Sequence, residues 1–129
     1  MKILVATHSL VWFAFADPKI TETAINVIAD TGNEILVSPA SYWEIAIKVA
    51  LGKWKLLRPY EELIDTLWRV YGFQILPILP SHTARLIELP FEHNDPFDRL
   101  LSAQALMEGV PLVSADTVFD KYGVSRIWF

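Results

Sequence analysis

The chain contains no cysteine among its 129 residues. This absence excludes disulfides, thiolate metal sites and cysteine nucleophiles, and it favours a reducing compartment, so we expect a cytoplasmic location. No run of about 20 uninterrupted apolar residues is present, so no membrane span is predicted. The apolar stretch from Ile3 to Ala16 has the composition of a signal peptide, but Thr7, His8 and Ser9 interrupt it, and we expect no export.

An excess of positive charge is also lacking. The formal net charge is −4, so binding to a nucleic acid would need a local basic patch rather than the charge of the whole protein. Residues 45–60 offer one candidate, because they contain four cations and no acid: Lys48, Lys53, Lys55 and Arg58. The alternative interpretation of these residues is a solvated loop.

Several common catalytic patterns are missing as well. The sequence has no phosphate-binding glycine loop, no pair of histidines at metal-ligand spacing and no serine in a glycine-flanked elbow. What it has in quantity is apolar side chain, at 53% of its residues. One domain with a sizeable core is therefore expected over residues 1–129.

The order of the apolar segments predicts an α/β fold. Strands are expected at residues 3–5, 34–37, 73–78, 110–113 and around 126–128, and helices at residues 8–15, 21–30, 39–50, 60–71, 81–88, 96–108 and, as a short turn or helix, 117–122. Short, continuously apolar strands separated by helices predict a mainly parallel sheet that is covered on both faces. Ligands of such sheets bind at the carboxyl ends of the strands.

Glu44 is the most informative acid of the chain. It lies in an expected helix in which Tyr42 and Ile45 form one apolar face while Trp43 makes the other side apolar too. A helix that is apolar nearly all round is expected to be buried. A carboxylate there costs several kcal/mol, by order of magnitude, unless a cation, a proton or hydrogen bonds compensate it. The alternative is a salt bridge to Lys48, four residues on.

Three further acids stand at expected strand-to-helix turns. Asp95 precedes Pro96 at the start of a helix, where capping is the favoured interpretation, and Asp98 lies in the first turn of the same helix. Asp116 follows an expected strand and suits an Asx turn. Each signal is weak alone, but their joint placement at one edge of a parallel sheet indicates a shared site.

With these motifs the chain resembles the PIN-domain ribonucleases, and within them the toxins of VapBC-type toxin–antitoxin pairs. Four segments in the right order carry the resemblance: residues 3–12, 37–48, 95–105 and 113–122. The resemblance implies a PIN domain with a three-layer α/β/α sandwich, a Mg²⁺ or Mn²⁺ ion bound by clustered carboxylates, cleavage of RNA and a small antitoxin that blocks the site.

The resemblance also assigns roles to individual residues. Glu44, Asp98 and Asp116 match the catalytic and metal-binding acids of the family, and Asp95 matches an additional acid of this subgroup. Ala6 is the departure, because the family carries Asp at that position. We therefore expect a ribonuclease whose activity is reduced or absent for want of one ligand.

Two alternatives remain open from the sequence. One is a non-catalytic PIN-like module that binds RNA or a protein partner. The other is a haloacid-dehalogenase-like phosphatase, which ranks last because it would need an aspartate nucleophile where Ala6 stands.

Contacts with partners are predicted from the surface residues. Lys48, Lys53 and Arg99 are expected near the rim of an RNA-binding groove. The abundance of large apolar side chains predicts a homodimer and a groove for an amphipathic antitoxin segment, with three tryptophans as candidates: Trp12, Trp54 and Trp68.

Overall fold

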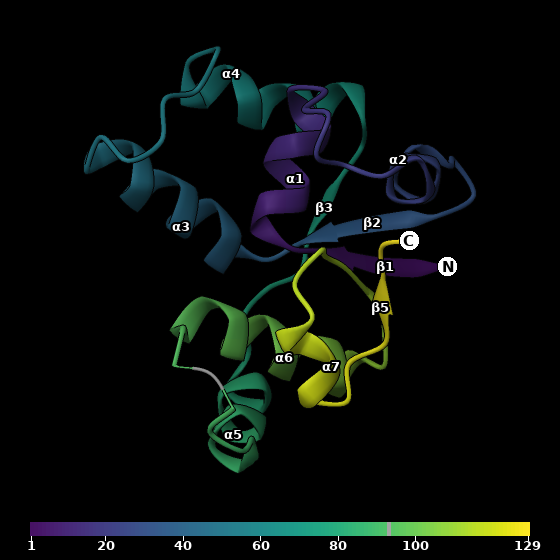
Figure 1. The fold of residues 1–129 in the computed structure, drawn as a ribbon, viewed down its shortest axis with the longest axis vertical. Helices are drawn as coiled ribbons and strands as arrows, with labels where there is room; N and C mark the ends of the chain where they lie inside the picture. The colour runs from purple at the N-terminus through teal and green to yellow at the C-terminus, as the bar shows by residue number, and fades with distance from the viewer. Residues whose placement is uncertain (93) are drawn as a thin grey trace.

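A computed structural model of the protein describes residues 1–92 and 94–129, so His93 lies outside the described part. The described strands form one five-stranded sheet in the order β3-β2-β1-β4-β5, and every neighbouring pair is parallel. The strands are β1 (Lys2–Val5), β2 (Glu34–Val37), β3 (Gln74–Ile75), β4 (Leu112–Val113) and β5 (Arg126–Ile127). The predicted parallel sheet is confirmed, with β1 at its centre (Figure 1).

Helices connect the strands and cover both faces of the sheet (Figure 1). They are α1 (Thr7–Ala14), α2 (Glu22–Ala29), α3 (Pro39–Ala50), α4 (Tyr60–Asp65), the π-helix η1 (Thr66–Val70), α5 (Pro80–Glu88), α6 (Pro96–Glu108) and α7 (Val118–Lys121). Within the described residues, none of these helices is long and apolar enough to cross a membrane.

Side chains that alternate between the two faces of the sheet produce two apolar cores. Ile3 and Val5 of β1 pack into one core with residues of α1 to α4 and η1, while Leu4 points to the other core, which contains residues of α6 and α7. Successive side chains of a strand point to opposite faces, so a continuously apolar strand must be buried on both. The chain therefore has the predicted three-layer α/β/α architecture.

Local signals set the ends of two helices, α3 and α6. Ser38 caps α3 by accepting a hydrogen bond from the amide of Ala40, and Pro39 occupies the first turn. Gly109 ends α6 with a φ of 65°, a left-handed conformation that favours glycine. Both helices thus begin or end where the sequence predicts.

Two elements differ from expectation. The helix predicted over residues 60–71 is α4 followed by η1, so its second half is a π-helix. The strand predicted over residues 73–78 pairs with β2 only at Gln74 and Ile75. It is an edge strand, and Pro77 has no amide hydrogen with which to continue the ladder.

Candidate active site

Three neighbouring strands end at the same edge of the sheet. Val5 of β1 pairs in register with Val113 of β4, and β2 runs parallel on the other side of β1. The next residue, Ala6, donates its amide hydrogen to the carbonyl of Val113 at 3.1 Å. Position 6, the start of α3 and the turn before Asp116 therefore lie together, as the fold class predicts.

A pair of hydroxyls joins two of the helices at this edge. Thr7 at the start of α1 donates a hydrogen bond through Oγ1 to Oγ of Ser41 in α3 at 3.0 Å, and both side chains are buried. Neither residue was predicted as part of the site. Their positions in the sequence could have identified them, because Thr7 follows position 6 and Ser41 precedes Glu44 by one helical turn.

The helices that carry Glu44 and Asp98 lie side by side. α3 and α6 are in contact, and the ring of Trp43 meets the ring of Phe97 edge-on at a centroid distance of 5.4 Å. These aromatic residues directly precede Glu44 and Asp98 in the sequence. The Ala6 methyl belongs to the core that also contains residues of α6, so position 6 faces the layer that carries Asp98.

Glu44 is buried without a compensating group. Its side chain is 4% exposed, and among the described residues no ion pair or hydrogen bond engages its carboxylate. The alternative of a Lys48 salt bridge is not observed, because the Lys48 ammonium lies 5.4 Å above the ring of Trp54 instead. A side chain this buried whose carboxylate has no ion pair favours a functional over a structural role.

The prediction that α3 is buried on all sides is wrong. Trp43 is 63% exposed and Ala50 is also exposed, whereas Ser41, Glu44 and Ile45 form the buried side of the helix. The acid thus lies on the face that packs inward, and the apolar face opposite to it meets solvent. An exposed apolar face of this kind is typical of an interaction surface.

The structural roles considered for Asp95 and Asp116 are confirmed. Oδ1 of Asp95 accepts hydrogen bonds from the amides of Phe97 at 2.8 Å and Asp98 at 3.3 Å, which caps α6. Oδ1 of Asp116 accepts from the amide of Val118 at 2.9 Å, as in an Asx turn. In both cases these bonds use one carboxylate oxygen, so capping does not exclude a second role for either acid.

The residues present do not complete a metal centre by themselves. Across residues 1–92 and 94–129, no three Asp, Glu, His or Cys side chains are grouped so that they could hold one ion. A buried carboxylate such as that of Glu44 could bind a cation, but too few further oxygen ligands surround it to coordinate a divalent ion. Ala6, 5% exposed at the end of β1, contributes only a methyl group.

Arg99 does not have the position predicted for it. Its side chain is 6% exposed, and its guanidinium donates hydrogen bonds to the carbonyl oxygens of Pro90 at 2.8 Å and Leu86 at 3.3 Å. The same group lies 4.4 Å from the ring centroid of Phe91. Arg99 therefore ties the end of α5 to α6, because the planar guanidinium fits converging carbonyl groups, and it is not available at an RNA-binding rim.

His82 has the structural role expected of an isolated histidine. It is fully buried, accepts a hydrogen bond at Nδ1 from the amide of Leu79 at 3.0 Å, and lies 2.8 Å through Nε2 from a carboxylate oxygen of Glu108. Nδ1 thus closes the start of α5 on itself, and Nε2 joins α5 to α6.

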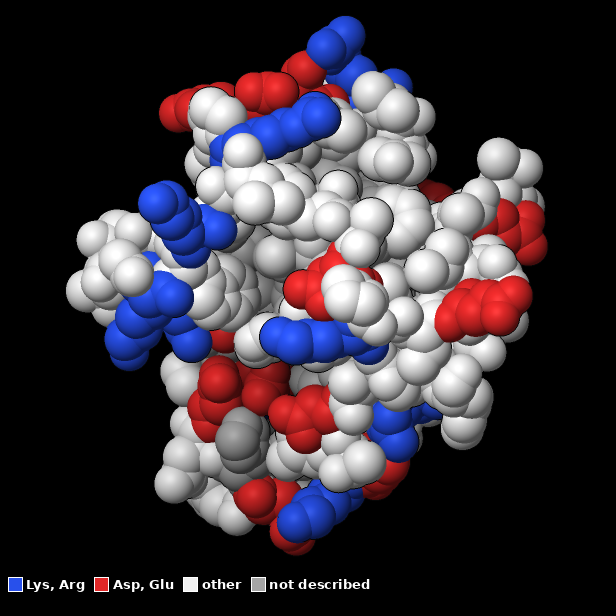
Figure 2. Space-filling model, turned by 45° about the horizontal axis from the view of Figure 1, so that its top comes forward, with Lys and Arg blue, Asp and Glu red and all other residues white. Residues whose placement is uncertain are grey.

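Two groups of like charge stand out on this side of the molecule, although charges of both signs adjoin elsewhere on it. Figure 2 shows basic side chains gathered on one flank of the face and a group of acidic side chains directly below them. Of the lysines predicted to contact RNA, Lys53 is exposed and Lys48 is partly buried against Trp54. A polyanion next to the acidic group would therefore find cations on the adjacent flank.

Comparisons with known proteins agree with this architecture. The PIN domain family matches residues 3–124. Ribonuclease VapC16 of Mycobacterium tuberculosis (strain ATCC 25618 / H37Rv) is 35% identical over 71 residues, which are 52% of this chain and 50% of that protein. The chain thus matches about half the length of this curated relative.

Solved structures show the same fold over nearly the whole chain. VapBC2 of Rickettsia felis, bound to a DNA fragment from its promoter, has a TM-score of 0.75 at 18% identity and covers 100% of both chains. FitAcB of Neisseria gonorrhoeae has a TM-score of 0.67 at 20% identity and covers 97% of this chain and 96% of its own. VapBC-1 of nontypeable Haemophilus influenzae has a TM-score of 0.67 at 16% identity and covers 98% and 97%.

The family match covers residues 3–124, and the solved structures share the fold of this chain. The chain therefore belongs to the PIN-domain family.

Proposed function

We propose that this protein is an endoribonuclease that acts as the toxin of a toxin–antitoxin pair, and that its activity is reduced or absent because Ala6 stands where the family carries Asp. The observation that supports the site most directly is the burial of Glu44 without a partner among the described residues. The similarity to Ribonuclease VapC16 supports RNA as the substrate class.

The proposed site comprises Glu44, Asp98 and Asp116, with Asp95 beside them. With a carboxylate restored at position 6, these acids would hold Mg²⁺ or Mn²⁺, and a bound ion of this type would activate water and neutralise charge that develops on a phosphate. The chain contributes the positioning: α3 holds Glu44 on its buried face, and Asp95 fixes the first turn of α6, where Asp98 lies. Lys48 and Lys53 are proposed to bind the RNA backbone, in the cytoplasm.

Partners are proposed from the exposed apolar surface. Trp43 and Trp68 are 63% and 53% exposed, and Trp12 and Trp54 are partly buried. The similar solved structures are VapBC and FitAB complexes. We therefore propose a VapB-type antitoxin with an amphipathic segment as one partner, and a second copy of this chain as another.

The experiment that tests the proposal is Ala6→Asp. A carboxylate at the end of β1 supplies an oxygen ligand beside the other acids, so RNA cleavage in Mg²⁺ or Mn²⁺ should rise by roughly 10²-fold or more, in keeping with the losses that misplaced catalytic groups cause. Cleavage of several RNA classes is measured on gels. Expression of the variant without an antitoxin should also arrest growth.

Matched variants separate a restored site from an unrelated gain. Ala6→Asn supplies an oxygen without the full charge and should recover less activity. Glu44→Gln or Asp98→Asn in the Ala6→Asp background should abolish the gain, because the acids serve one site. Equal, negligible cleavage by the original chain and a correctly folded Ala6→Asp variant would favour a non-catalytic module that binds RNA or a protein.

A further inference from the structure

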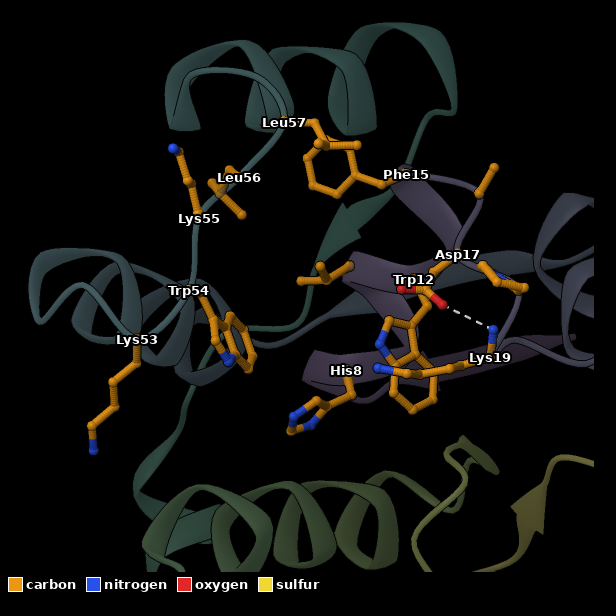
Figure 3. Close-up of a pocket in the computed structure, with 13 residues that line it drawn as sticks. His8, Trp12, Phe15, Asp17, Lys19, Lys53, Trp54, Lys55, Leu56 and Leu57 are labelled. Atoms are coloured by element: carbon orange, nitrogen blue, oxygen red, sulfur yellow. Dashed lines mark hydrogen bonds between the residues drawn. The ribbon is translucent and has the colours of Figure 1, made fainter.

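A recess lies on the outer side of α1. It encloses about 710 Å³ and is lined by residues of α1, of the turn that follows α1, and of the segment after α3. We call it the aromatic pocket, after His8, Trp12 and Trp54. Figure 3 shows Trp54 and His8 pointing toward one another across it, with Trp12 next to His8.

The three rings of the pocket form one contact group. His8 meets Trp54 edge-on at a centroid distance of 5.1 Å and Trp12 at 5.8 Å with a tilt of 56°. His8 is exposed, and both indoles are partly buried, so the rings are anchored and yet open to a ligand. Such a group offers flat π surfaces to a planar partner.

Cations accompany these rings. The Lys19 ammonium lies 5.7 Å from the centroid of Trp12, and that of Lys48 lies 5.4 Å from the centroid of Trp54. Lys19, Lys53 and Lys55 line the pocket, Lys48 lies beside it over Trp54, and Asp17 is the only acid among the lining residues. The pocket is therefore locally cationic, although the whole chain carries −4.

The pocket adjoins the proposed catalytic edge through α1. His8 directly follows Thr7, whose hydroxyl is bonded to Ser41, one helical turn before Glu44. An RNA strand that runs from the carboxyl edge of the sheet along the first turn of α1 would therefore meet His8 next. The pocket is thus placed for a segment of substrate that continues beyond the acids.

We propose that the aromatic pocket binds one nucleotide of a single-stranded RNA, with the base against Trp54 and His8 and a phosphate near Lys19, Lys48 or Lys53. Stacking on aromatic rings together with backbone contacts to cations is how single strands are commonly held. The cations beside the rings favour a polyanion in this pocket, and the exposed Trp43 and Trp68 outside it remain for the amphipathic segment of an antitoxin. The inference rests on the proposed function, since it names a substrate subsite, and it assigns the pocket to positioning rather than to chemistry.

The test measures RNA binding apart from cleavage. A short fluorescent single-stranded RNA of mixed sequence is titrated with the original chain in EDTA, and anisotropy gives Kd. Trp54→Ala should raise Kd by about 5- to 150-fold, because stacking of one base contributes about 1–3 kcal/mol. His8→Ala should weaken binding in the same direction, and Trp54→Phe, which keeps a ring, should lose less. Lys53→Ala should lower the slope of log affinity against log salt by about 0.7.

Ile87→Ala is the control, because Ile87 is an exposed apolar residue of α5 outside the pocket and should leave Kd unchanged. Equal Kd for the original chain and a folded Trp54→Ala variant would overturn the proposal. So would a loss of self-association or of antitoxin binding in that variant with RNA affinity intact, since the pocket would then be a protein interface. Failure of Ala6→Asp to cleave RNA, with binding still dependent on Trp54, would sink the catalytic proposal alone.

Discussion

The thermal stability of an Ala6→Asp variant tests the proposed site without any enzyme assay. Position 6 is 5% exposed and is the N-cap of α1, with no side-chain hydrogen bond at that cap. Two effects of the new carboxylate oppose each other. As an N-cap acceptor it should stabilise the fold by about 1 kcal/mol. As a buried charge near Glu44, which has no described partner, it should cost about 3–5 kcal/mol.

The cost is the larger effect, so the free energy of unfolding should fall by about 2–4 kcal/mol in the absence of metal. At roughly 4 °C per kcal/mol for a domain of this size, Tm should drop by about 8–16 °C. An ion bound by the completed set of carboxylates reverses this loss: Mg²⁺ or Mn²⁺ at about a hundred times its Kd contributes about 2.7 kcal/mol. Tm should then recover by about 11 °C.

Differential scanning calorimetry of the original chain, Ala6→Asp and Ala6→Asn, each in EDTA and in Mg²⁺, measures these terms. Ala6→Asn provides the capping oxygen without the charge, so it should be at least as stable as the original chain and respond little to Mg²⁺. An Ala6→Asp variant that is as stable as Ala6→Asn in EDTA and does not respond to either metal would refute the reasoning, because Glu44 and position 6 would then not share a site.

Two other predictions follow from a buried arginine and a half-buried tyrosine. Arg99→Lys should lower the free energy of unfolding by about 1–3 kcal/mol, because the carbonyl groups that accept hydrogen bonds from Arg99 lose their donor. Urea denaturation measures this loss. The RNA affinity of the variant should equal that of the original chain. Burial, and secondarily the nearby Tyr60, raises the pKa of Tyr42 from 10.0 to about 12. As pH rises, the unfolded chain therefore releases this proton before the folded chain does, and the free energy of unfolding should decline between about pH 10 and 12. Ultraviolet titration of the folded protein should show one late-forming phenolate that Tyr42→Phe lacks. If Tyr42 were freely hydrated, its phenolate would instead form near pH 10.

The carboxyl edge of the sheet shows how much of a site a local sequence pattern can predict. Apolar strands between helices fix a parallel sheet, and parallel strands bring their carboxyl ends to one edge, so the grouping of position 6, α3 and Asp116 follows from the order of elements. The capping role of Asp95 is equally local, since its acceptors and donors lie within three residues. These features depend on contacts that are near in sequence or dictated by fold class.

Side-chain environments depend on contacts that are far apart in sequence. The pattern of α3 could not tell which of its apolar faces meets solvent, and the fold exposes Trp43 while burying Glu44. Arg99 resembles a surface cation in sequence, but the end of α5 brings carbonyl groups to its guanidinium. The aromatic pocket likewise joins His8 to Trp54 across 46 positions of the chain.

The sequence by itself therefore determined the α/β class, most helix ends and the set of acids, because periodicity and capping act over a few residues. Tertiary structure alone decided which charges are buried, which lack a partner and which aromatic rings face a common recess. These properties depend on how α1, α3 and α6 pack around the sheet, and no local pattern encodes the solvent access or the neighbours that this packing creates.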